Sequence, residues 1–360
     1  MSKLKTSFIT LCALLLLAPV AFAQEARSSE TEFGDEVEVS EVLLDVIVTN
    51  KDGQVIVGLG PEDFRVTEDG EAVELQSVRF YSSSVPQEAA AEMEGVDPVP
   101  EDRYFIFFVD DQRKNQASVG VNLVQRQMQA GRDAAEWAER NLAPADWVAV
   151  VGYDRSLKVY TDFTRDQGLI AKAVKDATAG RQGMGNWPSR QKDEGPSLLD
   201  DLPQGKALTK ATTRVYSALT EVAKAAGDIT GRKNLIYLGL GFGRLNRFGA
   251  YDEDERYYPD MIHAINDNNV AVYPLDVSPS GASHPFESAL TNLAEDTGGR
   301  YFPFFSSFNT PLAEITQETN GYYLLSYRAS HPAGEEGFQR VKVEATNGEF
   351  KVRARRGYEF

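Results

Sequence analysis

The sequence predicts an α/β protein, with a doubly wound, mostly parallel β-sheet flanked by β-only segments at both ends. Strand and helix patterns alternate between residues 104 and 297, and this alternation builds a parallel sheet with helices on both faces. Residues 104–109 (YFIFFV) form a continuous apolar run, which is typical of a strand buried on both faces. The segments before Tyr81 and after Gly321 contain strand patterns alone.

The N-terminal β segment, residues 39–82, is expected to hold four strands. They cover residues 39–50, 55–57, 64–67 and 73–81, with a strong hairpin signal at Asp69-Gly70 between the last two. Because so few strands cannot cover both of their own faces, another part of the chain must pack on them. Residues 83–102 are rich in Ser, Ala, Glu and Pro, which predicts a linker.

The α/β block is expected to span residues 103–319. Its predicted strands are residues 104–109, 147–153, 157–163, 234–238 and 270–275, of which the third pairs antiparallel with the second. Its predicted helices are residues 118–142, 167–178, 212–229, 260–267 and 286–297, and residues 180–205 form a long loop. Small and apolar residues of the first helix recur at steps of three and four, and this periodicity assigns Met128 to a packed core stripe.

The C-terminal β segment, residues 320–360, is predicted to contain three strands. They cover residues 321–328, 338–346 and 350–357. Since neither β segment is self-sufficient, residues 39–82 and 320–360 are expected to pack together as one β-sandwich-like domain. Two separate small β units remain the alternative.

The chain begins with the layout of a secretory signal peptide. Lys3 and Lys5 precede an apolar stretch over residues 8–20, and Ala21-Phe22-Ala23 offers small residues at the two positions that a signal peptidase reads. A spanning helix needs ~20 apolar residues, so we expect cleavage after Ala23 rather than an uncleaved anchor. The mature protein would be periplasmic or secreted, with a flexible start over residues 24–38.

Composition describes a folded, acidic protein. The net charge is −17, and without Lys3 and Lys5 the mature chain has 35 basic against 54 acidic residues, or −19. Such a field repels duplex nucleic acid and anionic membranes, so neither is expected as a partner. The sole cysteine, Cys12, leaves with the signal peptide, which excludes disulfides and thiol chemistry from the mature chain.

Motifs along the chain carry a family resemblance. The α/β block has a strand ending in Asp110, a long first helix, GRKNLIYL at 231–238 and VAVYPLDV at 270–277. With these it resembles the von Willebrand factor type A (VWFA) domain, which implies a Rossmann-like sheet. The flanks resemble the VWFA-related family common in acidobacteria, on VIVTNKDGQVIVGLGPEDFRVTEDGE (46–71), GYYLLSY (321–327) and VKVEATNGEFKVRARRGY (341–358).

The resemblance implies a divalent-cation site at the C-terminal edge of the sheet. Such domains often hold Mg²⁺ through Asp-x-Ser-x-Ser after the first strand, a Thr before the second long helix and an Asp after the fourth strand, all oxygen ligands. Here Gln112 and Lys114 occupy the serine positions after Asp110, and Thr213 fits the threonine position. The late aspartate position falls near Leu240, where no carboxylate stands.

Two residues decide how this degenerate site is interpreted. The ammonium group of Lys114, if turned toward Asp110, would neutralise the charge that a cation needs. Asp111 could substitute as a ligand, which keeps Mg²⁺ binding through Asp110, Asp111 and Thr213 open as the alternative. We expect no cofactor and no tight binding of Mg²⁺ or Ca²⁺.

Other patterns associated with chemistry are incomplete. His263, His284 and His331 are expected to be surface histidines, because no GxSxG elbow exists and no carboxylate partner is indicated. The glycines of residues 239–243 (GLGFG) lack the spacing of a dinucleotide loop. The acidic run at residues 252–255 lacks the glycine of a calcium loop and is expected to be solvated.

The sequence leaves two hypotheses about the function of the protein. The first is an exported adhesion or scaffold module that binds a protein partner at the C-terminal edge of the sheet, where ligands of open α/β folds bind. Aromatic residues of the types that interfaces favour are expected to be exposed there: Trp187, Phe242, Phe248, Tyr251, Tyr257 and Tyr258. Local packing that holds the long loops is the equal alternative for them. The second function is an exported enzyme of unknown class using the same cleft, although no set of nucleophile, base and orienting group is recognised.

Overall fold

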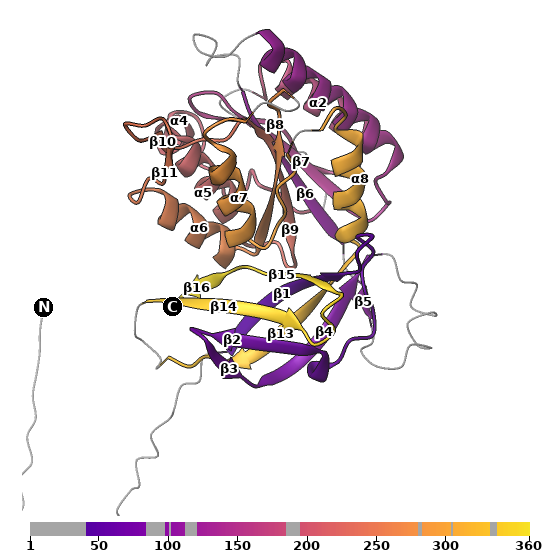
Figure 1. Ribbon diagram of the computed structural model, residues 1–360. Helices are drawn as coiled ribbons and strands as arrows, with labels where there is room; N and C mark the ends of the chain where they lie inside the picture. Colours follow the sequence, from indigo (N-terminus) through magenta and orange to yellow (C-terminus); the bar gives the residue numbers. More distant parts are fainter. Residues whose placement is uncertain are drawn as a thin grey trace, which may run out of the picture. The chain divides into compact units, whose positions relative to one another are not determined.

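A computed structural model describes residues 41–83, 98–100, 102–111, 121–184, 195–279, 283–303, 305–331 and 337–360 (Figure 1). The chain divides into two compact units, Met1–Glu38 and Val39–Phe360, and every described residue belongs to the second. The predicted signal peptide and the flexible segment over residues 24–38 therefore lie outside the described residues.

A five-stranded sheet forms the centre of the α/β part, in the order β12-β9-β6-β7-β8. Its strands are β6 (Arg103–Asp110), β7 (Asp146–Tyr153), β8 (Leu157–Thr164), β9 (Lys233–Gly239) and β12 (Val270–Asp276). The edge strand β8 runs antiparallel to β7, whereas the other neighbours pair in parallel. This confirms the predicted α/β class and the predicted antiparallel edge.

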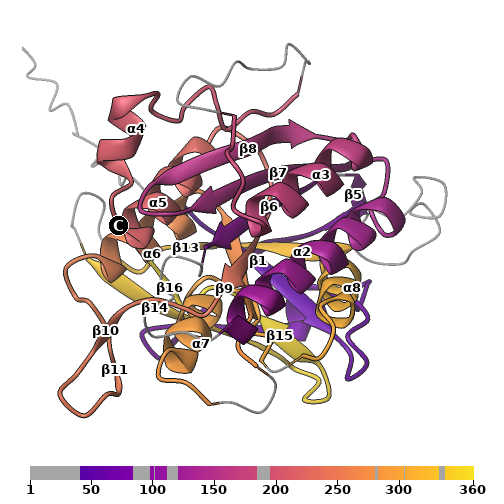
Figure 2. The same cartoon turned by 90° about the horizontal axis from the view of Figure 1, so that it is seen from above.

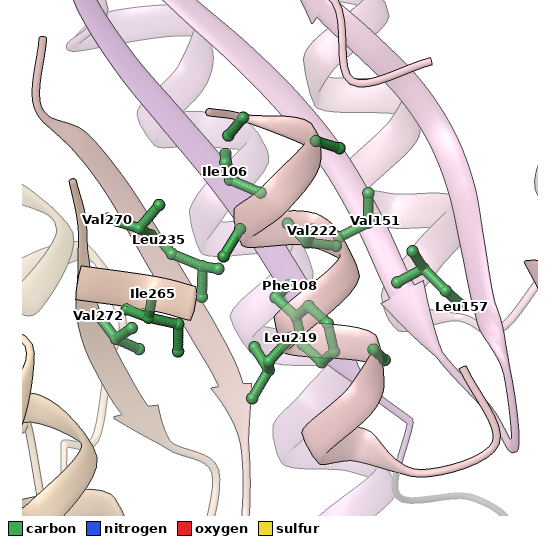
Figure 3. Packing of buried hydrophobic residues seen from close by; sticks show 14 of the residues in the cluster. Ile106, Phe108, Val151, Leu157, Leu219, Val222, Leu235, Ile265, Val270 and Val272 are labelled. Atoms are coloured by element: carbon green, nitrogen blue, oxygen red, sulfur yellow. The ribbon is translucent and has the colours of Figure 1, made fainter. Parts of the chain in front are cut away.

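Helices cover both faces of this sheet (Figure 2). One face packs against α2 (Val121–Arg140), α3 (Gln167–Thr178) and α8 (Asn309–Glu318). The other face packs against α5 (Val215–Ala225), α6 (Tyr258–Asp267) and α7 (Glu287–Asp296). Along β6, Phe105 and Phe107 enter the first core while Ile106 and Phe108 enter the second, because successive side chains of a strand alternate between faces. Figure 3 shows the second core, where Ile106 and Phe108 lie beside Leu219 and Val222 of α5.

The two terminal segments build the β-rich part together. Its strands are β1 (Glu41–Thr49), β2 (Phe64–Glu68), β3 (Glu71–Val73), β4 (Leu75–Ser82), β5 (Pro98–Pro100), β13 (Gly321–Arg328), β14 (Phe338–Ala345), β15 (Lys351–Arg353) and β16 (Gly357–Glu359). They form a five-stranded sheet, β15-β1-β13-β4-β5, and a four-stranded sheet, β16-β14-β2-β3.

C-terminal strands pair with N-terminal strands in both sheets. β13 lies between β1 and β4, and β14 pairs with β2. The two sheets share one core, in which the rings of Phe64 and Tyr323 lie 5.3 Å apart. The prediction of one β-sandwich-like part built from both termini is thus confirmed. The boundaries at residues 83, 103 and 320 stay predictions, since Val39–Phe360 forms one compact unit.

Some predicted elements differ from the structure. β5 lies within the predicted linker and extends the sheet by pairing in parallel with β4. The helix predicted over residues 212–229 is confirmed as the shorter α5 (Val215–Ala225), and a separate helix, α4 (Lys206–Ala211), precedes it. The break falls at Thr212, whose hydroxyl donates to the Leu208 carbonyl and accepts from the Leu157 backbone N–H, tying the end of α4 to β8. α8 and the short hairpin of β10 (Arg244–Leu245) and β11 (Tyr251–Asp252) were not predicted.

The buried face of α2 also differs from the predicted stripe. Met128 is 41% exposed, so its assignment to the core is wrong. The buried positions include Leu123, Gln127, Ala130 and Trp137. Gln127 can be buried because its side-chain amide donates a hydrogen bond to the Thr178 carbonyl. The predicted stripe contained only small and apolar residues, so it did not include this glutamine. Within the described part of the chain, no helix has the length and apolar composition to cross a membrane.

Candidate functional site

Two buried carboxylates lie at the C-terminal ends of the parallel strands. Asp110 is the last residue of β6 and is 8% exposed, and Asp276 is the last residue of β12 and is 1% exposed. β9 separates these two strands in the sheet. Ligands of open α/β folds bind at this edge, so these two carboxylates mark the candidate site.

Asp110 is held by a tyrosine of the neighbouring strand. The Tyr237 hydroxyl donates a hydrogen bond to Asp110 Oδ2 at 2.6 Å, and the tyrosine side chain is fully buried. Burial and the negative charge of Asp110 raise the pKa of Tyr237 well above its ordinary value. The phenol therefore remains protonated and acts as a permanent donor to the carboxylate.

Asp111 faces the opposite side of the sheet. Its Oδ1 accepts a hydrogen bond from Gln127 Nε2 of α2 at 3.3 Å, whereas Tyr237 belongs to the core beneath α5. Successive strand residues point in opposite directions, which is the physical reason. Asp111 is thus poorly placed to join Asp110 around one ion.

Two of the other predicted metal-site positions, Thr213 and Leu240, lie among the described residues. The Thr213 side chain is exposed, and its backbone carbonyl accepts a hydrogen bond from the Tyr153 hydroxyl at 3.0 Å. Leu240 packs against the core under α2. Gln112 and Lys114 lie outside the described residues, so the structure does not test their predicted roles.

Asp276 is the centre of a cluster that sequence analysis missed. Its Oδ2 accepts from His284 Nε2 at 2.8 Å and from the Tyr301 hydroxyl at 2.9 Å, and its Oδ1 accepts from the Ser278 backbone N–H at 2.7 Å. The prediction that His284 is a surface histidine without a carboxylate partner is wrong, because its side chain is 10% exposed and paired. The sequence contained one sign of this pairing. Asp276 directly follows the predicted strand over residues 270–275 and lies eight residues before His284.

Both ring nitrogens of His284 are engaged. Nδ1 accepts a hydrogen bond from the Phe286 backbone N–H at 3.3 Å, so the ring proton is assigned to Nε2, which faces Asp276. Burial and the charge of Asp276 raise the pKa of Tyr301, which keeps that hydroxyl protonated as well. The arrangement fixes the loop after β12 and leaves His284 no lone pair for a substrate.

The carboxylate oxygens of Asp110 and Asp276 do not fit the coordination of a divalent cation. Asp110 Oδ2 and both oxygens of Asp276 accept hydrogen bonds, whereas a hard cation needs oxygen lone pairs directed at one point. No group of three or more His, Cys, Asp or Glu side chains is placed to hold a metal within the described ranges. We derive no step that passes through a metal.

The predicted aromatic surface is divided between core and solvent. Phe242 and Tyr258 are 8% and 5% exposed, so their predicted exposure is wrong. The Phe242 ring packs edge-on against Tyr216 at 4.9 Å, and the Tyr258 hydroxyl donates to Asp296 at 2.7 Å. Tyr251 and Tyr257 are half-buried, and Trp187 lies outside the described residues. Phe242 and Tyr258 therefore follow the alternative interpretation, in which the aromatic side chains pack locally.

Among the predicted aromatics that lie in the described ranges, Phe248 is the highly exposed one, at 79%, and it lies in the turn between β10 and β11. Asn246 organises this turn, since its Oδ1 accepts from the backbone N–H groups of Phe248 and Ala250 at 2.9 and 3.1 Å. The Arg247 guanidinium lies 4.7 Å from the centre of the Phe248 ring. Leu245 in β10 is a second exposed apolar residue, at 46%. Figure 2 shows the hairpin projecting from the body of the molecule.

Comparisons with known proteins concern the fold. No family model and no curated protein matches the chain. Among solved structures, the chain is similar to an aerotolerance-related membrane protein from Bacteroides fragilis, with 13% identity, a TM-score of 0.39 and coverage of 61% of this chain and 98% of that one. It is also similar to a von Willebrand factor type A protein from Catenulispora acidiphila, with 12% identity, a TM-score of 0.38 and coverage of 88% and 72%. BatB from Bacteroides thetaiotaomicron shows 15% identity, a TM-score of 0.36 and coverage of 60% and 97%.

One of these three structures is a von Willebrand factor type A protein. Membership of the VWFA-related family common in acidobacteria stays a prediction. Identities and TM-scores at this level carry no argument about function, which rests on the geometry alone.

Proposed function

We propose that the chain is an exported adhesion or scaffold module that binds a protein partner at the C-terminal edge of its parallel sheet. The observation that carries this proposal is the β10–β11 hairpin, which follows the C-terminal end of β9 and presents Phe248 and Leu245 to solvent. Large exposed aromatic side chains are typical anchors of protein interfaces, because burying them on binding removes apolar surface from water.

The hairpin is ordered before any partner arrives. Its turn is closed by Asn246, and its second strand is anchored at Tyr251, whose ring lies close to Gly243. Gly243 has φ of +131°, and a Cβ there would lie 2.5 Å from the Tyr251 ring. Because this backbone is already fixed, binding would lose less conformational entropy than the ordering of a free loop.

The surroundings of Phe248 suit a partner with mixed polarity. Arg244 forms an ion pair with Asp252 across the hairpin at 3.7 Å, and Arg247 stacks on the Phe248 ring. An apolar anchor between charged side chains resembles the centre and rim of a protein interface. Nucleic acid is not the proposed partner, given the net charge of −17.

The enzyme alternative has weaker support. Asp110 and Asp276, the buried carboxylates at the C-terminal edge of the sheet, each accept a hydrogen bond from a tyrosine hydroxyl, and His284 uses both ring nitrogens. A general base needs a free lone pair directed at its substrate. We therefore propose that this cluster supports the loops around the binding surface, without a metal and without catalysis.

Loss of the exposed anchor tests the proposal. We expect Phe248→Ser to weaken capture of at least one envelope protein by about thirtyfold or more, since central aromatic anchors contribute ~2 kcal/mol or more. The matched control is Phe338→Ser, because Phe338 in β14 is also an exposed phenylalanine, at 50%, but belongs to the β-rich part. Captured proteins would be compared by quantitative mass spectrometry after both variants show the thermal unfolding of the wild type.

Binding that Phe338→Ser leaves intact and Phe248→Ser removes would support the proposal. Equal capture by the wild type, Phe248→Ser and Phe338→Ser would show that any binding surface lies away from both phenylalanines. The enzyme alternative would be favoured if the Phe248→Ser variant turned over a substrate and the His284→Ala variant did not.

A further inference from the structure

A groove lies between α2 and α3 on the outer side of the α/β part, and we call it the α2–α3 groove. Its volume is about 430 Å³, and Met128 is part of its wall. Four cationic and two anionic side chains also line it: Arg132, Lys172, Lys175, Arg181, Glu139 and Asp176. Figure 2 shows the two helices side by side and away from the β10–β11 hairpin.

The close packing of the two helices forms the floor of the groove. Gly131 of α2 lies against Thr178 of α3, since a Cβ on Gly131 would be 1.9 Å from Thr178 Oγ1. Gln127 of α2 donates a hydrogen bond to the Thr178 carbonyl at 2.8 Å. The charged side chains therefore stand on two helices that are fixed to each other, which reduces the conformational entropy that binding would lose.

The groove carries a surplus of positive charge. Lys172 and Arg181 share one carboxylate, Asp176, at 2.7 and 2.8 Å, and both cationic side chains are 71% exposed. Arg132 and Lys175 are exposed and form no ion pair with another described residue. The lining thus has two more cationic than anionic groups, on a chain whose net charge is −17.

A second hollow extends this positive surface along α2. Its volume is about 710 Å³, and it shares Met128 and Arg132 with the α2–α3 groove. Arg126 adds a cationic group, and none of the described residues that line this hollow carries a carboxylate. Arg126 is held in place by a hydrogen bond to the Ser306 carbonyl at 3.3 Å and by the Phe308 ring, whose centre is 4.8 Å away.

The dimensions of the two hollows suit a short extended segment. From Gln125 to Glu139, α2 rises by about 21 Å, which is the reach of about six extended residues. Met128 lines both hollows and is 41% exposed, so it offers a flexible apolar contact between the cationic groups. Glu139 would repel an acidic group at its own end, so the acidic part of a bound segment belongs near Met128.

We propose that the α2–α3 groove binds a short acidic peptide segment of a protein partner. The carboxylates of the segment pair with Arg132, Lys175 and the cationic groups around Asp176, and an apolar side chain of the segment contacts Met128. A long polyanion such as nucleic acid fits less well, because beyond the groove it would meet the field of an acidic protein. The groove shares no residue with the hairpin surface at Phe248, so the two proposals stand separately.

The test measures binding of a fluorescein-labelled hexapeptide, Glu-Glu-Leu-Leu-Glu-Glu, to the full mature chain by fluorescence anisotropy. We expect a Kd below about 1 mM at about 50 mM salt, where exposed charges are only weakly screened. The same peptide with glutamine in place of glutamate should bind at least about tenfold more weakly, because it offers no carboxylates to the groove. Raising the salt to about 0.5 M should weaken the glutamate peptide alone.

A pair of double variants assigns the site. Arg132→Gln with Lys175→Gln should weaken the glutamate peptide by at least about fivefold, since two exposed charge pairs are lost. The matched control is Lys206→Gln with Lys210→Gln, which removes two exposed positive charges from α4, outside the groove. Both double variants have the same net charge, so a difference between them reports the groove itself. Phe248→Ser should bind the peptide like the wild type.

Three results would overturn the proposal. The first is equal binding of the glutamate and glutamine peptides, or binding of neither, by the wild-type chain. The second is an equal loss of affinity in both double variants, which would assign the effect to the net charge of the protein. The third is binding of a labelled oligothymidylate of the same charge as tightly as the glutamate peptide, which would indicate a general anion site. The first and third results need only the wild-type chain.

Discussion

At the residue scale, tyrosine hydroxyls hydrogen-bond both buried carboxylates at the C-terminal edge of the sheet. Tyr237 donates to Asp110 and Tyr301 donates to Asp276, and each phenol has a raised pKa caused first by burial and then by the carboxylate it contacts. Hydrogen bonds from neutral donors stabilise these buried anions. Each carboxylate is therefore stabilised by a hydrogen bond within the protein itself.

This geometry leads to a prediction about metals. We expect isothermal titration of the mature chain to show no micromolar affinity for Mg²⁺ or Ca²⁺, and partner binding to survive EDTA, because bound water alone rarely holds such ions. Asp110→Ala should leave the titration unchanged, as should the control Asp252→Ala at an exposed carboxylate. Micromolar Mg²⁺ binding by the wild type that disappears in Asp110→Ala would show a functional metal site.

At the scale of elements, α2 and α3 lie close together at Gly131. A Cβ on Gly131 would lie 1.9 Å from Thr178 Oγ1 and 2.7 Å from Thr178 Cβ. Thr178 cannot turn away freely, since its hydroxyl donates to the Val174 carbonyl at 2.8 Å. The glycine thus sets the distance between the two helices on this face of the sheet.

Gly131→Ala should therefore destabilise the protein, although alanine is the better helix former. We expect the free energy of unfolding to fall by about 1–3 kcal/mol, the usual cost of overpacking. The control is Gly168→Ala in the first turn of α3, where the nearest atom to a new Cβ is Asp166 Oδ1 at 3.4 Å. That variant should be neutral or stabilised by up to about 1 kcal/mol. Urea unfolding measures both, and equal stabilities would contradict the assigned close approach.

At the scale of the whole described unit, an ion pair links the α/β part to the β-rich part. Glu318 at the end of α8 is 1% exposed and lies 2.7 Å from Arg353 of β15 and 3.3 Å from Arg300. Burial raises the pKa of Glu318, and the two arginines oppose that rise. The link holds a C-terminal strand against a helix of the preceding α/β part.

Glu318→Ala should lower the free energy of unfolding by about 3 kcal/mol, because removing one member of a buried pair leaves the other charge without compensation. Glu314→Ala is the control, since Glu314 pairs with the same Arg300 at 2.7 Å but its side chain is 36% exposed. Exposed pairs contribute up to about 1 kcal/mol. If Glu314→Ala lost as much stability as Glu318→Ala, burial would not determine how much the ion pair contributes to the free energy of unfolding.

Local patterns in the sequence determined the class of the protein and most of its elements. α3 begins and ends at the predicted residues, and the apolar run of β6 forms the buried central strand. Both follow from interactions between near neighbours, since periodicity and capping act over a few residues. Export, the domain boundaries and the roles of Gln112 and Lys114 remain predictions from the sequence.

The tertiary structure alone decided which of these residues meet. The insertion of β13 between β1 and β4, the burial of Phe242, the exposure of Met128 and the pairing of His284 with Asp276 depend on contacts with other elements. A hydrophobic pattern specifies that a face is buried, but the shape and polarity of its neighbour decide which residues fill it. For the same reason, the α2–α3 groove appears only once the two helices are brought together.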